Sequence, residues 1–134
     1  MKHALLWDSS AVLAVLDEAD SNHGTARALL ERLAEKPHHA VITNYLLVEA
    51  HALLLRRLGR GVAREWLEKA SPPVLQATAR DEERGREIIA RHRDKNYSLC
   101  DAISFAVMEA RAIRRVFTFD RHFRQYGRFE VIGV

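Results

Sequence analysis

The strongest constraint on the fold lies between residues 98 and 108, where the sequence Ser-Leu-Cys-Asp-Ala-Ile-Ser-Phe-Ala-Val-Met predicts a helix that is apolar on almost every side. Such a helix belongs in the interior of a protein, because it has no face that favours water. Asp101 lies in its first turn, beside this expected core. A buried carboxylate is costly unless it is paired, hydrogen-bonded or bound to a metal. The group that stabilises Asp101 is therefore the first question that the sequence raises.

Helix capping is one answer to that question. Ser98 and Asp101 have the spacing of a capping box, in which each side chain satisfies a backbone amide at the start of the helix. Considered alone, this structural role is the better supported one. A functional role for Asp101 requires that other acidic residues come to the same place in the fold.

Short apolar runs alternate with helical segments along the rest of the chain. Strands are predicted at residues 3–7, 40–42, 72–78, 116–119 and 129–132. This alternation favours an α/β fold with a parallel sheet and helices on both of its faces. Two prolines open the run at residues 72–78, which favours a strand at the edge of the sheet. The length of 134 residues fits one such domain, so we expect residues 1–134 to form a single unit.

The composition narrows the class of protein. One cysteine excludes an internal disulfide and suggests a reducing compartment. The absence of a signal peptide and of an apolar run that could span a membrane predicts a soluble, cytoplasmic protein. The formal net charge of +3 is too small to identify a nucleic-acid-binding protein by itself.

Three more acidic residues stand at informative places. Asp8 follows the first predicted strand and Asp120 follows the fourth, so both are expected at strand ends. Glu49 shares one face of a predicted helix with Leu46 and Leu53, which aims its carboxylate at the core. Each acid has a structural alternative: Asp8 and Asp120 could cap the helices that follow them, and Glu49 could form a buried ion pair with an arginine.

A parallel α/β sheet would bring these four carboxylates together. Ligands bind beyond the carboxyl ends of the strands, where the strand order reverses. Two carboxylates at ~4 Å repel each other by about 4 kcal/mol at an effective dielectric constant near 20. A hard divalent cation such as Mg²⁺ or Mn²⁺ suits an all-oxygen site. With no histidine or cysteine completing the set, Zn²⁺ is disfavoured.

Four acidic segments follow one another along the whole chain. They are Leu-Trp-Asp-Ser-Ser-Ala-Val-Leu at residues 6–13, Thr-Asn-Tyr-Leu-Leu-Val-Glu at 43–49, Ser-Leu-Cys-Asp-Ala-Ile-Ser-Phe at 98–105 and Phe-Thr-Phe-Asp-Arg-His-Phe at 117–123. In this order and at this chain length they resemble the acidic motifs of PIN-domain ribonucleases, and in particular the VapC-like toxins of prokaryotic toxin–antitoxin pairs. Many relatives carry a hydroxyl residue before the third acid, where this chain has Cys100.

The resemblance implies a three-layer α/β/α fold with a central parallel sheet of about five short strands. It implies that Asp8, Glu49, Asp101 and Asp120 bind Mg²⁺ or Mn²⁺, and that the Thr118 hydroxyl helps to place water or metal. The expected activity is metal-dependent endonucleolytic cleavage of RNA. The expected partners are the RNA substrate, a cognate antitoxin protein and a second copy of the chain in a homodimer.

Arginines near these acids are candidates for holding RNA phosphates. We expect this role for Arg91, Arg121 and Arg124, with a solvated surface as the alternative. Other functions stay open at this point: a PIN-fold nuclease that is not a toxin, a phosphatase or phospho-acceptor domain, and a silent binding module. A phosphatase usually needs a second aspartate two residues after the first, where this chain has Ser10. A phospho-acceptor domain needs a lysine at a later strand end, and the strand at 116–119 has none.

Overall fold

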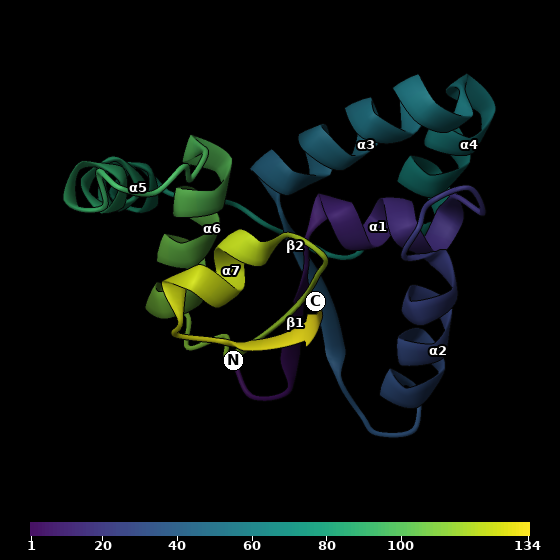
Figure 1. Cartoon of the computed structure of the whole chain (residues 1–134), viewed down its shortest axis with the longest axis horizontal. Helices are drawn as coiled ribbons and strands as arrows, with labels where there is room; N and C mark the ends of the chain where they lie inside the picture. Colours follow the sequence, from purple (N-terminus) through teal and green to yellow (C-terminus); the bar gives the residue numbers. More distant parts are fainter.

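The computed structural model describes residues 1–134 and has a five-stranded sheet at its centre (Figure 1). Every pairing in the sheet is parallel, and the strand order is β3-β2-β1-β4-β5. The strands are β1 (Ala4–Trp7), β2 (His39–Thr43), β3 (Val74–Leu75), β4 (Arg115–Thr118) and β5 (Glu130–Gly133). The predicted parallel α/β fold is therefore confirmed.

Helices cover both faces of this sheet. They are α1 (Ser9–Leu16), α2 (His23–Leu33), α3 (Asn44–Leu58), α4 (Arg60–Glu65) with the π-helical turn η1 (Trp66–Ala70), α5 (Ala79–Arg91), α6 (Leu99–Ala110) and α7 (Arg121–Tyr126). Figure 1 shows α1 and α2 apart from α5, α6 and α7, with the strands between the two groups. The three-layer arrangement is the predicted one.

Two hydrophobic cores explain why the strands are continuous apolar runs. Leu5 and Phe117 pack with α1 and α2 on one face, while Leu6 and Val116 pack with the larger group of helices on the other. All four side chains are fully buried. Because side chains alternate between the two faces of a strand, a strand covered on both faces favours apolar residues at successive positions.

The strand order reverses between β1 and β4. The chain runs from β1 outward to β2 and β3, then returns to place β4 on the other side of β1. Trp7 at the end of β1 is in register with Phe117 near the end of β4. The residues that follow these two strands therefore meet at the carboxyl edge of the sheet, where α/β proteins form their ligand sites.

Helix α6 is the buried helix that the sequence predicted. Every residue from Asp101 to Met108 is buried. Gly85 of α5 lies directly against it, because a Cβ atom added at Gly85 would be 2.8 Å from Ile103 Cγ1 and 3.1 Å from its backbone nitrogen. The lack of a side chain at Gly85 thus sets the distance between α5 and α6, and with it the position of Asp101.

Some element bounds differ from the predictions. The strand predicted at residues 72–78 is only Val74–Leu75, at the edge of the sheet as expected, because Pro72 and Pro73 have no amide hydrogen for a ladder. The leucine spacing between residues 22 and 36 predicts a helix that Pro37 would end, but the helix there, α2, already ends at Leu33. None of the helices has the length and the apolar character that crossing a membrane would require.

Candidate functional site

Asp8 lies at the corner between β1 and α1. It occupies the N-cap position of α1, but its side chain makes no capping hydrogen bond. Its Oδ2 atom instead accepts hydrogen bonds from the hydroxyls of Ser10, at 2.6 Å, and Thr118, at 2.7 Å. Asp8 is only 3 % exposed. The proposed capping role is therefore not the one the side chain performs, and its carboxylate is held toward the end of β4.

A hydroxyl network joins the ends of β1 and β4. Thr118 is fully buried, and its Oγ1 atom, which donates to Asp8, also accepts from the backbone nitrogen of Asp120 at 2.9 Å. Ser10 donates to Asp8 and accepts from the backbone nitrogen of Phe119 at 2.9 Å. These bonds fix the Asp8 carboxylate relative to Asp120, although the two residues come from distant parts of the chain.

Asp101 combines the capping role with a second contact. Its Oδ2 atom accepts from the backbone nitrogen of Ser98 at 3.1 Å, and Ser98 Oγ accepts from the Asp101 nitrogen at 3.0 Å. The predicted capping box is therefore present. The same Oδ2 atom also lies 2.9 Å from Nδ1 of His122, on α7. Capping therefore leaves Asp101 free to take part in a site.

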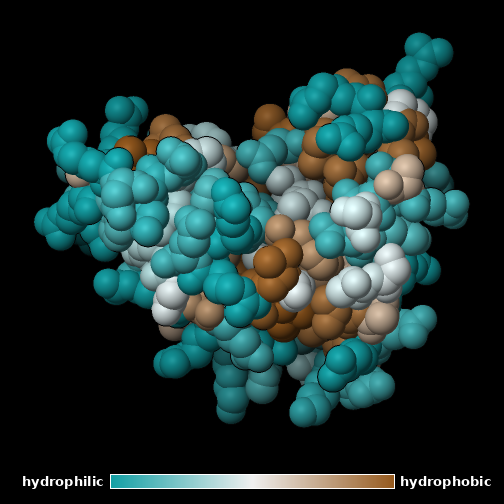
Figure 2. All heavy atoms as spheres, viewed as in Figure 1, coloured by the Kyte–Doolittle hydropathy of each residue, from teal (hydrophilic) through white to brown (hydrophobic).

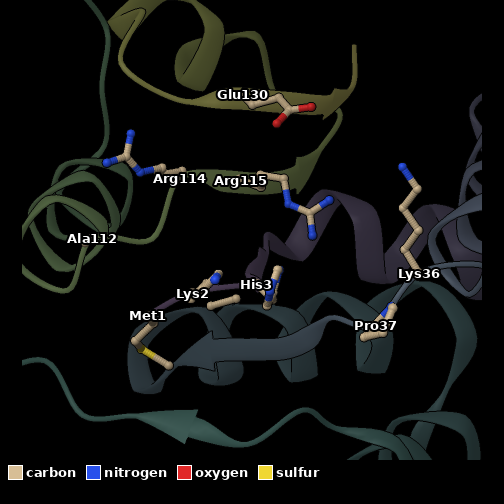
Figure 3. Close-up of a pocket in the computed structure, with 10 residues that line it drawn as sticks. Met1, Lys2, His3, Lys36, Pro37, Ala112, Arg114, Arg115 and Glu130 are labelled. Atoms are coloured by element: carbon tan, nitrogen blue, oxygen red, sulfur yellow. The ribbon is translucent and has the colours of Figure 1, made fainter.

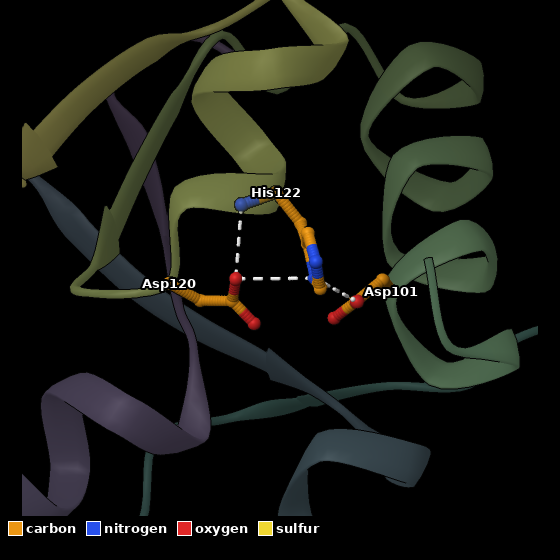
Figure 4. A group of neighbouring side chains, drawn as sticks. All are labelled: Asp101, Asp120 and His122. Carbon is orange, nitrogen blue, oxygen red and sulfur yellow. Dashed lines mark hydrogen bonds and ion pairs between the residues drawn. The ribbon is translucent and has the colours of Figure 1, made fainter. Parts of the chain in front are cut away.

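His122 bridges two of the acids and was missed by the sequence analysis. Its Nδ1 atom is 2.9 Å from Asp101 Oδ2 and 3.2 Å from Asp120 Oδ1. Figure 4 shows the two carboxylates on either side of the imidazole ring. Both oxygens are acceptors, which assigns the hydrogen to Nδ1. Asp120 also caps α7, because its Oδ1 atom accepts from the His122 backbone nitrogen at 2.9 Å.

The expectation that Glu49 points into the core is wrong. Glu49 is exposed, and its Oε1 atom accepts a hydrogen bond from the hydroxyl of Ser9, the residue next to Asp8. No arginine pairs with it. Leu46, one turn earlier on α3, is buried in the core, whereas Glu49 lies at the surface beside the start of α1. Glu49 thus reaches the neighbourhood of Asp8 from the rim and not from the core.

Burial and neighbouring negative charges shift the pKa values of the carboxylates in the site. Burial is the main reason that the pKa of Asp8 is raised from 3.8 to about 6; the hydroxyls of Ser10 and Thr118 oppose the shift, and the charges of Asp120 and Asp101 add to it. Burial and the charge of Asp120 also raise the pKa of Asp101. Neither a lysine nor an arginine forms an ion pair with any of the four acids. The site lacks a cation that would make all of these charges stable together.

Cys100 lies among the same acids. Burial first, and then the carboxylates of Glu49, Asp101 and Asp8, raise the pKa of its thiol above the ordinary range. A thiol in this environment stays protonated and is a poor nucleophile. In the sequence no cation stands beside Cys100 to lower its pKa, which likewise favours a small packing residue over a nucleophile. The raised pKa also shows that Glu49 and Asp101 are near enough to act on one side chain.

The donor set fits a divalent cation. All hydrogen bonds to Asp8 and Asp101 end on Oδ2, and those to Asp120 end on Oδ1, which leaves one oxygen of each aspartate unused. These oxygens are not among the buried polar atoms without a partner, so they face accessible space. One ligand atom each from Asp101, Asp120 and His122 lies within 4.8 Å of the others, so this group could hold a metal ion. Because His122 belongs to this group, Zn²⁺ is no longer disfavoured by the lack of a histidine ligand.

The three candidate phosphate-binding arginines differ in their surroundings. Arg91 forms an ion pair with Glu87 at 2.8 Å, and Arg124 donates from Nε to the carbonyl oxygen of Val134 at 2.8 Å. Arg121 is exposed, follows Asp120 directly and forms no ion pair. Their contact with RNA stays a prediction, and Arg121 has the most freedom to make it.

Comparison with known proteins identifies a family that matches this chain. The profile of the PIN domain matches residues 5–129, which include all four acids. A relative described as the 23S rRNA-specific endonuclease VapC20 of Mycobacterium tuberculosis is 35% identical over 127 residues, and the match covers 92% of this chain and 95% of that protein.

Solved structures show the same fold. The crystal structure of Mycobacterium tuberculosis VapC20, described as a sarcin–ricin loop cleaving toxin, has a TM-score of 0.82 and 34% identity, and covers 95% of this chain and 98% of its own. VapBC2 from Rickettsia felis, bound to a DNA fragment from its promoter, has a TM-score of 0.72 at 10% identity, with 96% and 97% coverage. A toxin–antitoxin complex from Klebsiella pneumoniae has a TM-score of 0.66 at 17% identity, with 96% and 95% coverage. At these low identities the last two show the fold alone.

Proposed function

This chain belongs to the PIN-domain family, and on that basis we propose that it is a metal-dependent endoribonuclease that acts as the toxin of a toxin–antitoxin pair. The observation that carries the proposal is the group formed by Asp101, Asp120 and His122, whose ligand atoms lie within 4.8 Å of one another. Asp8 is near enough for the charges of Asp101 and Asp120 to raise its pKa, and no lysine or arginine forms an ion pair with any of the three aspartates. The similarity to VapC20 over nearly the whole chain supports RNA as the substrate class. Ribosomal RNA is therefore the first substrate to test.

The aspartates would hold the metal. Asp8, Asp101 and Asp120 each offer a free carboxylate oxygen, and Glu49 stands at the rim where it could complete the coordination or orient a water molecule. Bound Mg²⁺ or Mn²⁺ would lower the pKa of a water molecule and neutralise charge on the scissile phosphate. The chain itself does the positioning: Thr118 holds Asp8, and His122 holds Asp101 against Asp120.

The hydrogen bonds of the site prepare it for this role. Thr118 and Ser10 keep the Asp8 carboxylate in one orientation, and they occupy only the oxygen that points toward β4. A cation entering the site therefore meets ligands that need little rearrangement.

A protein partner is also part of the proposal. Several large apolar side chains are exposed along α3 and the α4–η1 segment; they are Val48, Leu55, Val62 and Leu67. Figure 2 shows hydrophobic surface over this corner of the molecule. An antitoxin or a second copy of the chain would cover such a surface, because apolar area of this kind favours association.

The test compares the wild-type chain with Asp101→Asn. Asparagine keeps the size of the side chain and one acceptor for the Ser98 amide, but it removes the charge. The wild type should cleave ribosomal RNA only when Mg²⁺ or Mn²⁺ is present, and induced expression should arrest bacterial growth. Asp101→Asn should do neither, with an unchanged circular dichroism spectrum. Cleavage by the folded variant at the wild-type rate would refute the assignment.

A further inference from the structure

The amino edge of the sheet carries a second concentration of charge, opposite in sign to the first. A pocket of about 680 Å³ opens there, between segments at or just before the starts of β1, β2, β4 and β5 (Figure 3). Its charged and titratable lining residues are Lys2, His3, Lys36, Arg114, Arg115 and Glu130. Four cationic side chains and one carboxylate thus belong to the residues that line it. We call this feature the basic pocket; its excess of positive charge is as large as the net charge of +3 of the whole chain.

The four cations of the basic pocket have no partners within the protein. No ion pair in the structure involves them. Arg115 and Glu130 are neighbours in register across β4 and β5, yet even they do not form one. Figure 3 shows the ends of Arg115 and Lys36 at the same opening, whereas Arg114 points away from it. Like charges gathered in this way repel each other, and a bound anion would relieve that repulsion.

The floor of the basic pocket is held rigidly. His3 has a left-handed backbone with a φ of 65°, a conformation that costs a non-glycine residue roughly 1 kcal/mol. Its carbonyl oxygen accepts a hydrogen bond from the backbone nitrogen of His39 at 2.8 Å, so the sheet fixes it in place. A floor that is fixed before binding lowers the entropic cost of holding a ligand.

The lining indicates the chemistry of the ligand. Met1 is the one large apolar side chain among the residues that line the pocket, and no aromatic ring of Phe, Tyr or Trp is present. Protein interfaces and sites for apolar ligands are built around such anchors, whereas lysine and arginine without them are typical of contacts to phosphate. The basic pocket therefore suits a polyanion whose charges are phosphates.

We propose that the basic pocket binds phosphate groups of an RNA backbone, at the edge of the sheet opposite the acidic residues. That the polymer is RNA rests on the proposed function. Strands of four residues, at ~3.3 Å per residue, separate the two edges by about 13 Å. A single nucleotide could not lie in the basic pocket and at the acids together, but a longer RNA could. This contact would add affinity without touching the bond that is cut.

RNA binding without metal tests the proposal. The full chain is titrated in EDTA with a labelled single-stranded RNA, and fluorescence anisotropy gives the affinity over a series of KCl concentrations. Lys2→Gln combined with Lys36→Gln removes two charges from exposed residues outside the strands. Each lost phosphate contact should lower the slope of log affinity against log salt by about 0.7, and the pair should weaken binding on the order of 20-fold at moderate salt. Arg115→Gln provides an independent variant.

The control removes the same charge elsewhere. Arg64→Gln combined with Lys69→Gln acts on exposed residues of α4 and η1 that form no ion pair. If the control pair and the basic-pocket pair change the slope equally, only the net charge matters and the proposal is overturned. An unchanged slope in the basic-pocket variants would overturn it as well. RNA displaced equally well by inorganic phosphate or polyglutamate would also overturn it. Because this assay needs neither metal nor cleavage, an inactive wild-type chain would refute the proposed function and leave this result standing.

Discussion

Replacing Asp8 with asparagine should stabilise the metal-free protein near neutral pH. The pKa of Asp8 is about 6 in the folded chain against an ordinary value of 3.8, and the residue is 3 % exposed. Between these two values the folded state binds the proton that the unfolded state has released, so stability falls as the pH rises. The stabilisation that protonated Asp8 gives to the folded chain is fully present below pH 3.8 and is lost as the pH rises through about 6. At about 1.4 kcal/mol per unit, ionisation of Asp8 costs the folded chain on the order of 3 kcal/mol.

Asparagine has the same shape and can still accept hydrogen bonds from Ser10 and Thr118, but it has no charge to bury. In EDTA, Asp8→Asn should therefore be more stable than the wild type by up to about 3 kcal/mol above pH 7, and the difference should vanish near pH 4. Urea denaturation of both chains across this pH range measures the difference directly. Titrating groups that do not interact with Asp8, such as the Asp81–Arg111 ion pair, contribute equally to both chains and cancel in the comparison.

Metal should reverse the comparison. Mg²⁺ or Mn²⁺ stabilises the charged form of Asp8, so the wild type should gain stability on metal addition near neutral pH, while the variant should gain much less. A stability difference between the two chains that is independent of pH would show that the buried charge of Asp8 does not destabilise the folded chain. A wild type that is the more stable chain in EDTA at neutral pH would show the same.

Substitutions at three further positions test how the site is held in place. His122→Asn keeps an N–H donor near the position of Nδ1, so its Mn²⁺ affinity, measured by calorimetry, should stay within about threefold of wild type. His122→Phe removes the donor and should lower the Mn²⁺ affinity by about tenfold or more. Equal affinities for the two variants would contradict the positioning role of His122. Thr118→Val keeps the shape of a buried side chain but removes its hydrogen bonds. The free energy of unfolding, measured by urea denaturation, should fall by about 1–3 kcal/mol, and metal binding should weaken. Unchanged metal affinity would contradict the contact between Thr118 and Asp8. Gly85→Ala should cost about 1–3 kcal/mol, because the new methyl group meets α6. The matched control Gly24→Ala, with nothing within 4 Å of the added atom, should be neutral or stabilising.

The fold followed from the sequence because its main signals are local. Buried parallel strands need apolar side chains on both faces, so residues 3–7 and 116–119 stand out without knowledge of their neighbours. The placement of Asp8 and Asp120 at one sheet edge then follows from parallel topology alone. The capping box of Ser98 and Asp101 was also visible, since its spacing is short.

The parts that were not predicted depend on contacts between distant segments. Helical periodicity placed Glu49 on an inward face, but it could not show that α3 borders an open edge there, so the residue proved exposed. His122 stands only two residues after Asp120, yet its contact with Asp101 depends on how α7 packs beside α6. An acid followed by a histidine at the start of a short helix was the one available signal. The basic pocket likewise collects residues from four separate segments.

If acids from separate segments form one site for a divalent cation, a calorimetric titration with Mn²⁺ near neutral pH will detect that site. We expect saturable binding to the wild-type chain and a loss of affinity by at least about tenfold in Asp8→Asn, Asp101→Asn and Asp120→Asn alike. Glu65→Gln, an exposed acid on α4, is the control and should bind as the wild type does. Wild-type affinity in any of the three folded aspartate variants would show that the three acids do not form one site.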